Sequence, residues 1–358
     1  MNDSSTDGPR PRDGLPTRAY TRPQDDAHID LWLDSNEGPA ANARRFASAP
    51  TEVEALRSYP NDRALRLALA ARFGVGEEQV AIGTGADELL DRICRAFLAP
   101  GRRLCAPSPC FPMLPRYGQL AGAELAWVPW HDGALPTAAL LARTQLDGRP
   151  TVLFLTTPNN PTGLVIGAAE LVAIAAALPQ TLVVADLAYV EFADDDPTAA
   201  LLALPNVLVV RTFSKGFGLA GLRVGYAMGA AEVIAALTVC GSPFPVAAPS
   251  LALALLALQT GPDGDAIAAV RRERELLALE LRRRGFAVSP PAANFVFARA
   301  DRREQVEALA ATLRQRGIQI RTFAPDDEFL ARAVRITCPG DAEAFRRLCA
   351  ALPGADAR

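Results

Sequence analysis

Short apolar strands alternate with helical segments along most of this chain, and this alternation constrains the fold more than any other feature. The clearest strands are 152–156, 182–185 and 207–211, where nearly every position is apolar. A strand that is apolar on both faces is typical of a sheet covered by helices on both sides. The pattern therefore predicts an α/β fold with a three-layer, helix–sheet–helix domain whose sheet is mostly parallel.

The chain divides into three expected parts. Residues 1–30 are polar and rich in Pro, Asp, Arg and Thr, which predicts a flexible arm. We expect the large domain at 31–255, its first segment packing on a small α+β domain at 256–358. The expected helices are 61–73, 87–98, 112–120, 168–178, 266–284, 304–316 and one ending at 352. Further strands are expected at 79–82, 103–106, 124–128, 223–228, 286–288, 294–298, 318–321 and 334–337.

Composition excludes several classes of function. The formal net charge of −3 argues against a nucleic-acid binder. The longest apolar run, Val246–Leu258, is shorter than the roughly 18 residues of a membrane span. Because the first residues also lack the apolar stretch of a secretory signal, we expect a cytoplasmic protein. With 2 histidines and 6 scattered cysteines, neither a metal site nor a Ser-His-Asp triad is expected.

One lysine, Lys215, stands among 37 basic residues, and all the others are arginine. A guanidinium stays protonated in proteins, whereas an amine can lose its proton and attack a carbonyl. Drift toward arginine would also leave a stray lysine, so composition alone does not decide between a chemical role and drift.

The neighbours of Lys215 include Gly216, Gly218 and Gly221, which spell G-x-G-x-x-G. The spacing invites a dinucleotide-binding interpretation, but that motif opens a helix, and here a further strand is expected. We therefore reject that interpretation and expect the glycines to let the backbone fold closely around a ligand joined to Lys215.

Three other segments carry polar groups at strand ends. The stretch 79–90 predicts a strand that turns directly into a helix, where free N–H groups of Gly85, Ala86 and Asp87 form an anion site. A plain helix cap by Thr84 accounts for the same stretch equally well. Asp186 ends an apolar strand, and a buried carboxylate needs a partner. The segment 156–163 is a rigid polar turn.

Taken in order, these segments resemble the fold-type I pyridoxal-phosphate enzymes of aminotransferase class I/II, and within them the histidinol-phosphate aminotransferases. The resemblance runs from about residue 34 to 347. It is carried by LDSNEGP, RSYPN, GTGADELL, PNNPTG, DLAY, RTFSKGFGLAGLRVGY, NFVFAR and VRIT.

The resemblance implies pyridoxal 5′-phosphate as the cofactor and gives each matching residue a role. Lys215 would hold the cofactor covalently through its amine and later move the substrate's α-proton. Asp186 would face the pyridine nitrogen, and Asn160 and Tyr189 would bond the phenolic oxygen. Phe111 would stack on the ring. The remaining cofactor residues would surround the phosphate: Gly85, Ala86, Asp87, Thr212, Ser214, Arg223 and, from a second subunit, Tyr59.

The resemblance also implies a substrate site and a homodimer with shared active sites. Arg335 would grip the α-carboxylate of glutamate, with Asn36 close by. Arg321 and Tyr20 would meet the phosphate of histidinol phosphate, Tyr20 coming from the arm of the neighbouring subunit. The chain departs from the family at Leu187, at 335–340 and at 243–246, which leaves the amino donor open.

The expected reaction transfers the amino group of histidinol phosphate to 2-oxoglutarate, giving imidazole acetol phosphate and glutamate. Two alternatives keep the cofactor: an aromatic amino acid aminotransferase and a threonine-phosphate decarboxylase. A third is an inactive relative that only binds a ligand, which the intact Lys215, Asp186 and Arg335 disfavour.

Overall fold

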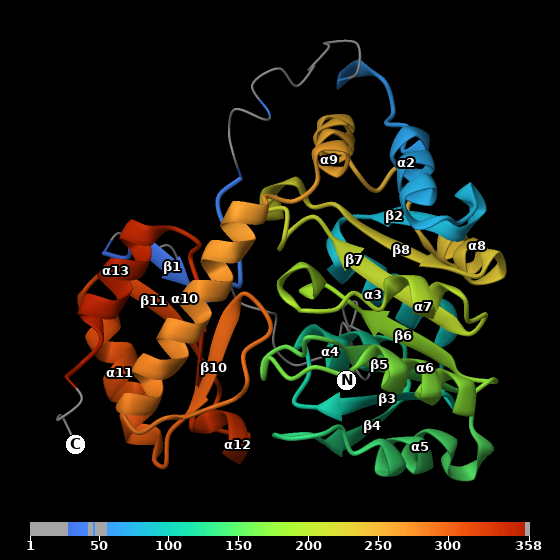
Figure 1. Ribbon diagram of the computed structural model, residues 1–358. Coiled ribbons are helices and arrows are strands. Elements are labelled where there is room, and N and C mark those ends of the chain that lie inside the picture. The colour runs from blue at the N-terminus through green and yellow to red at the C-terminus, as the bar shows by residue number, and fades with distance from the viewer. Residues whose placement is uncertain (1–27, 42–45, 47–55, 355–358) are drawn as a thin grey trace, which may run out of the picture.

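The computed structural model describes residues 28–41, 46 and 56–354, and within them it contains two sheets, a large one and a small one (Figure 1). The large sheet has seven strands. In spatial order they are β2 (Val80–Gly83), β8 (Gly225–Gly229), β7 (Val207–Thr212), β6 (Leu182–Asp186), β5 (Thr151–Thr156), β3 (Arg103–Ser108) and β4 (Glu124–Pro129). All pairings from β7 to β4 are parallel, and β8 is antiparallel to both of its neighbours.

Helices cover both faces of the large sheet. One face carries α2 (Arg63–Phe73), α5 (Thr137–Gln145), α6 (Ala168–Ala177), α7 (Thr198–Leu202) and α9 (Ala248–Thr260). The other face carries α3 (Gly85–Phe97), α4 (Met113–Leu120) and α8 (Ala231–Cys240). Along β5, Leu153 and Leu155 pack on the first face, whereas Val152 and Phe154 pack on the second. This alternation explains why the central strands are apolar at every position, and it confirms the predicted three-layer α/β architecture.

The small sheet lies beside the large one, at the left of Figure 1. In spatial order its strands are β1 (Leu31–Leu33), β11 (Ile318–Thr322), β12 (Ala333–Thr337), β10 (Phe295–Arg299) and β9 (Ala287–Val288). Its helices are α10 (Gly264–Arg283), α11 (Arg303–Gln315), α12 (Glu328–Ala331) and α13 (Ala342–Ala351). Strand β1 pairs with β11 in parallel, so the start of the described chain is built into this sheet. The predicted domain division at residue 255 stays a prediction.

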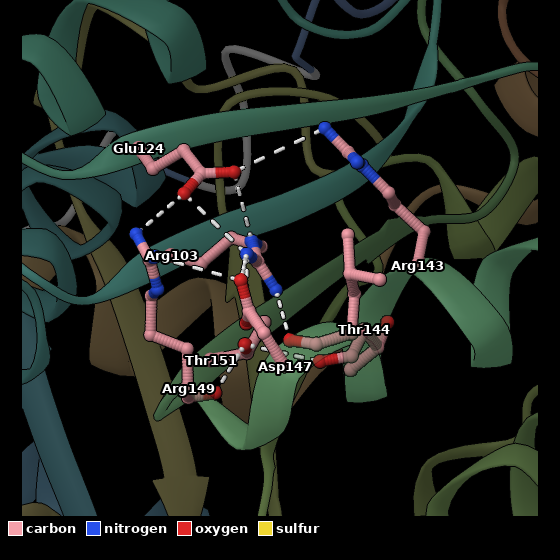
Figure 2. Close-up of polar contacts among 8 residues, drawn as sticks. Arg103, Glu124, Arg143, Thr144, Asp147, Arg149 and Thr151 are labelled. Atoms are coloured by element: carbon pink, nitrogen blue, oxygen red, sulfur yellow. Dashed lines mark hydrogen bonds and ion pairs between the residues drawn. The ribbon is translucent and has the colours of Figure 1, made fainter.

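The amino end of the large sheet is tied together by one buried arginine, Arg103 at the start of β3. Its guanidinium contacts Glu124 at 3.1 Å, Asp147 at 3.0 Å and the carbonyl oxygen of Leu146 at 2.7 Å (Figure 2). Arg149 adds a 2.7 Å bond to Glu124. The desolvation penalty of a buried charge is offset when several well-placed partners bond to it. This cluster holds β3, β4 and the segment before β5 together at the amino end of the sheet.

The loop after Lys215 leads into the antiparallel strand β8 by way of a short 3₁₀ turn, Ala220–Leu222. The strand predicted after these glycines is therefore confirmed, where a dinucleotide-binding motif would open an α-helix. No helix in the described part of the chain is both long and apolar enough to span a bilayer.

Candidate active site

The carboxyl ends of four strands place the predicted site residues along one edge of the large sheet. Register pairs Thr156 with Asp186, and Thr212 with Gly225, which in turn lies opposite Gly83. Strands β2, β5, β6 and β7 all run toward this edge, so the residues that follow them lie close together. This edge is where open α/β sheets bind ligands.

Lys215 follows the end of β7 and is half-buried. Its Nζ donates hydrogen bonds to the carbonyl oxygens of Asn36 (2.6 Å) and Ser35 (3.1 Å), and lies 5.7 Å from the centre of the Tyr189 ring. Burial, followed by the positive charge of Arg335, lowers the pKa of Lys215 to about 8. A sizeable fraction of this amine is therefore neutral just above pH 7, as a carbonyl-attacking nucleophile requires.

Asp186 ends β6 and is only 6% exposed. Its carboxylate accepts hydrogen bonds from the Ala188 N–H (3.2 Å) and more weakly from the Thr156 hydroxyl (3.5 Å). Burial raises the pKa of Asp186 to about 7, and the negative charge of Asp87 adds to the rise. A buried carboxylate with this shift binds a cationic partner favourably when one is placed beside it.

The start of α3 forms the end of the site that suits an anion. Gly225 lies against this helix start, because a Cβ there would come within 2.5 Å of the Ala86 nitrogen. The Arg223 guanidinium lies beside the same helix start, 3.6 Å from the Asp87 carboxylate and 3.5 Å from the Ser214 hydroxyl. Thr212 donates a 3.0 Å hydrogen bond to Ser214. Helix N–H groups, two hydroxyls and a guanidinium fit a phosphate monoester.

Thr84 immediately precedes α3 but makes no side-chain cap for the helix. Its hydroxyl donates instead to the carbonyl oxygen of Pro245 at 2.5 Å. The simple cap that the sequence allowed is therefore wrong, because a tertiary partner takes the hydroxyl. The N–H groups at the helix start are left for another acceptor.

Arg335 reaches the site from the small sheet. It is buried on β12, where one nitrogen donates to Asn160 Oδ1 and another to the carbonyl oxygen of Asp34, both at 2.6 Å. Arg321 on β11 is its register partner. Because Arg335 donates to the oxygen of the Asn160 amide, the Nδ2 is the end of this amide that acts as a donor.

Residues 34–39 cross the site between the two sheets. The Cα of Gly38 lies so close to the Lys215 carbonyl oxygen that a Cβ would overlap it, so only glycine fits. Asn294 donates to the carbonyl oxygens of Asn36 (3.2 Å) and Glu37 (2.9 Å). Asn36 also contacts Tyr189 and Thr337 through its side chain.

Asn294 and Thr337 are the site residues that sequence reasoning missed. Both stand inside segments that carried the resemblance, NFVFAR and VRIT, but neither was given a role. The signal that could have found them is a polar side chain bordering an otherwise apolar strand, because such a group needs a buried partner.

Phe111 and Tyr59 are the remaining predicted cofactor residues that the structure describes. Phe111 is half-buried after β3 and packs in the cluster under α3 and α4. Tyr59 is 81% exposed and stacks on Phe244, with ring centres 4.6 Å apart, beside a pocket of about 320 Å³. Leu187, which departs from the family pattern, is fully buried and packs in the hydrophobic core of the large sheet. Tyr20 lies outside the described residues, as does most of the predicted arm.

The chain is similar to known proteins over most of its length. The sequence model described as "Aminotransferase class I and II" matches residues 33–352. The chain is 37% identical to histidinol-phosphate aminotransferase 1 of Burkholderia pseudomallei, over 89% of this chain and 92% of that protein. It is 38% identical to histidinol-phosphate aminotransferase 2 of Methylococcus capsulatus, over 74% and 75% of the two chains.

A solved structure shows the same fold. The histidinol-phosphate aminotransferase of Sinorhizobium meliloti, crystallised with pyridoxal 5′-phosphate, superimposes with a TM-score of 0.82 at 29% identity, covering 92% of each chain. The predicted fold type and enzyme class are thereby confirmed. This chain belongs to the class I and II aminotransferase family.

Proposed function

We propose that this protein is a pyridoxal-phosphate-dependent aminotransferase that moves the amino group of histidinol phosphate to 2-oxoglutarate. The products are imidazole acetol phosphate and glutamate, as in histidine biosynthesis. The relatives named above support this reaction. The observation that carries it is Arg335, whose charge helps to lower the pKa of the half-buried Lys215 amine, with Arg321 as its register partner on the neighbouring strand.

The site fits the cofactor from end to end. When bound, pyridoxal phosphate supplies an aldehyde for amines and a ring that withdraws electrons from the carbon bearing the amino group. The phosphate fits the start of α3, with Thr212, Ser214 and Arg223 around it. Asp186 would hold a proton on the ring nitrogen, because a buried carboxylate stabilises a neighbouring cation. Asn160 and Tyr189 would donate to the phenolic oxygen, and Phe111 would cover the ring.

Lys215 has two tasks in this proposal. As a neutral amine it would hold the cofactor covalently at its aldehyde carbon, with water as the leaving group. Once a substrate amine has displaced it, the same amine would carry the proton between the substrate's α-carbon and the cofactor. The carbonyl oxygens of Ser35 and Asn36 hold the ammonium form in place between these steps.

Arg335 and Arg321 distinguish the substrates. Arg335 binds the carboxylate of glutamate or 2-oxoglutarate, with Asn36 close by. A phosphate monoester carries more charge than a carboxylate and needs further donors. Like charges directly opposite on neighbouring strands are destabilising, so a pair of arginines there favours a dianionic ligand between them. We propose Tyr20 as a further donor.

We expect Arg321→Gln to lower kcat/KM for histidinol phosphate by about 10- to 100-fold, the size of a lost charge-assisted hydrogen bond. The half-reaction with glutamate should fall much less. Arg283→Gln, which removes an exposed guanidinium on α10, is the matched control and should leave both rates unchanged. Stopped-flow absorbance of the cofactor measures each half-reaction separately. Equal losses for the two donors would contradict the assignment of Arg321 to the phosphate.

A donor panel tests the proposal as a whole. The panel contains histidinol phosphate, phenylalanine, tyrosine and threonine phosphate, with carbon dioxide release measured for the last. Preference for an aromatic amino acid, or decarboxylation of threonine phosphate, would replace histidinol phosphate as the substrate. A chain that takes up no cofactor would favour a binding protein without turnover.

We expect the cofactor-free chain to take up pyridoxal phosphate faster as the pH rises through about 8. The pKa of Lys215 is lowered to about 8, and only the neutral amine attacks the aldehyde. Below that pH the rate should fall about tenfold per pH unit, because the neutral fraction does. The growth of absorbance from the bound cofactor gives the rate. A rate with no dependence between pH 6 and 9 would contradict the lowered pKa.

We propose that the working unit is a cytoplasmic homodimer. Tyr59, 81% exposed on its own chain, is available to reach the phosphate end of a neighbouring subunit's site. Its stacking on Phe244 presents a largely exposed aromatic surface at that position.

A further inference from the structure

Asn36 adopts a backbone conformation that few residues other than glycine accept. Its φ is 51°, in the left-handed region, where asparagine is several-fold enriched among the residues with a side chain. The residue is 1% exposed. Glycine would satisfy the backbone without strain but has no amide. The backbone conformation alone therefore does not explain why residue 36 carries a side-chain amide.

Three buried hydrogen bonds give the Asn36 amide a definite orientation. The Asn36 N–H donates to the Thr337 hydroxyl oxygen (3.1 Å), and that hydroxyl donates its proton to Asn36 Oδ1 (3.2 Å). With Oδ1 directed at Thr337, the Nδ2 of Asn36 points the other way and donates to the Tyr189 oxygen (3.1 Å). The hydrogen bonds of the two side chains therefore run in one direction: Thr337 donates to Asn36, and Asn36 donates to Tyr189.

This polarity decides what the Tyr189 hydroxyl can do. A phenol has one proton to donate and accepts through its oxygen. Because the oxygen already accepts from Asn36, its proton is not needed there and is free for the phenolic oxygen of the cofactor. We propose that Asn36, oriented by Thr337, is a positioning residue that makes the Tyr189 hydroxyl a hydrogen-bond donor toward the cofactor. This inference rests on the cofactor site of the proposed function and differs from the expected contact of Asn36 with substrate.

Other charges also act on Tyr189 and must stay constant in a test. They are Arg335 on β12, Asp186 on β6 and Asp87 on α3. In the cofactor-free chain the Lys215 nitrogen also lies 5.7 Å from the ring centre. Thr337→Val changes none of them, because it replaces a hydroxyl by a methyl group of similar size. Asn36→Asp keeps the shape of the side chain but replaces the Nδ2 donor by an acceptor.

The experiment titrates the absorbance of bound pyridoxal phosphate in the holoenzyme, without an amino donor. Without the hydrogen bond from Tyr189, the negative phenolic oxygen of the cofactor is less stabilised. The protonated form of the bound cofactor therefore persists to higher pH. We expect the midpoint to rise by about one pH unit in Asn36→Asp and by about half a unit in Thr337→Val, as for one lost hydrogen bond. Thr337→Ser keeps the hydroxyl and should restore the wild-type midpoint. Thermal unfolding midpoints report whether each variant remains folded.

Two outcomes would overturn the inference. A shift in Asn36→Asp with none in folded Thr337→Val would mean that the added charge acts alone. Equal shifts in Thr337→Val and Thr337→Ser would mean that side-chain packing, and not the hydroxyl, matters. The readout needs the cofactor but no amino donor, so a chain that binds pyridoxal phosphate and ignores histidinol phosphate would defeat the proposed substrate and leave this inference standing.

Discussion

Lys215→Arg is expected to lower turnover by at least about 10⁴-fold while leaving the chain folded. The guanidinium keeps the positive charge that the carbonyl oxygens of Ser35 and Asn36 bind, so the site retains its electrostatic balance. It does not lose a proton at any accessible pH, so it neither bonds to the aldehyde nor accepts the α-proton. Lys215→Ala removes the charge as well and is the companion variant.

Borohydride reduction followed by mass spectrometry checks this prediction. Since the chain has a single lysine, a reduced cofactor label on a side-chain amine can lie only at residue 215. The wild type should carry the label there and Lys215→Arg should carry none. A label retained by the folded variant, or turnover within tenfold of the wild type, would refute the role assigned to Lys215.

Asp186→Asn is expected to lower turnover by about 10³-fold, with cofactor binding weakened as well. The neutral amide has nearly the same shape but does not stabilise a proton on the ring nitrogen. Steady-state kinetics and the dissociation constant of pyridoxal phosphate measure the two effects. Thr156→Val, which removes the weak 3.5 Å hydrogen bond to the same carboxylate, is the control and should cost less than tenfold.

The stability of the cofactor-free protein separates this role from a structural one. Burial raises the pKa of Asp186 to about 7, above that of an unfolded chain. The protonated form therefore favours folding at low pH, and that contribution is lost as the pH rises through 7. Asp186→Asn removes the ionisation, so at pH 8 we expect its free energy of unfolding to equal or exceed that of the cofactor-free wild type. Marked destabilisation at pH 8 would indicate a structural carboxylate.

Much of the large sheet could be predicted because each central strand is buried on two faces. Strands at 152–156 and 207–211 were expected within a residue of the observed bounds, since a short, continuous apolar run between polar turns is typical of a strand buried on both faces. The helix expected at 168–178 was found at Ala168–Ala177.

Other elements left no comparable signal. Helix α9 is apolar on nearly every side, so its sequence shows no helical period, and the apolar run Val246–Leu258 by itself predicts no amphipathic helix. Strand β1 has three residues, too few for a pattern, and exists because β11 pairs with it. Thr84 was ambiguous because its partner, the carbonyl of Pro245, is distant in sequence.

The order of the residues alone specifies the family of this protein and the chemical groups of its candidate site. A lone lysine after a buried strand, an aspartate at the end of another and a glycine-bounded helix start are local features, and local propensity and burial specify them. The tertiary structure decided how these groups act. It brought Arg335 within hydrogen-bonding distance of Asn160, and the carbonyl oxygen of Asn36 within reach of the Lys215 amine. It also placed Asn294 and Thr337 where both donate hydrogen bonds to Asn36. The physical reason is that hydrogen-bond polarity and desolvation depend on partners far away in the sequence, which only the folded packing of two sheets brings within hydrogen-bonding distance.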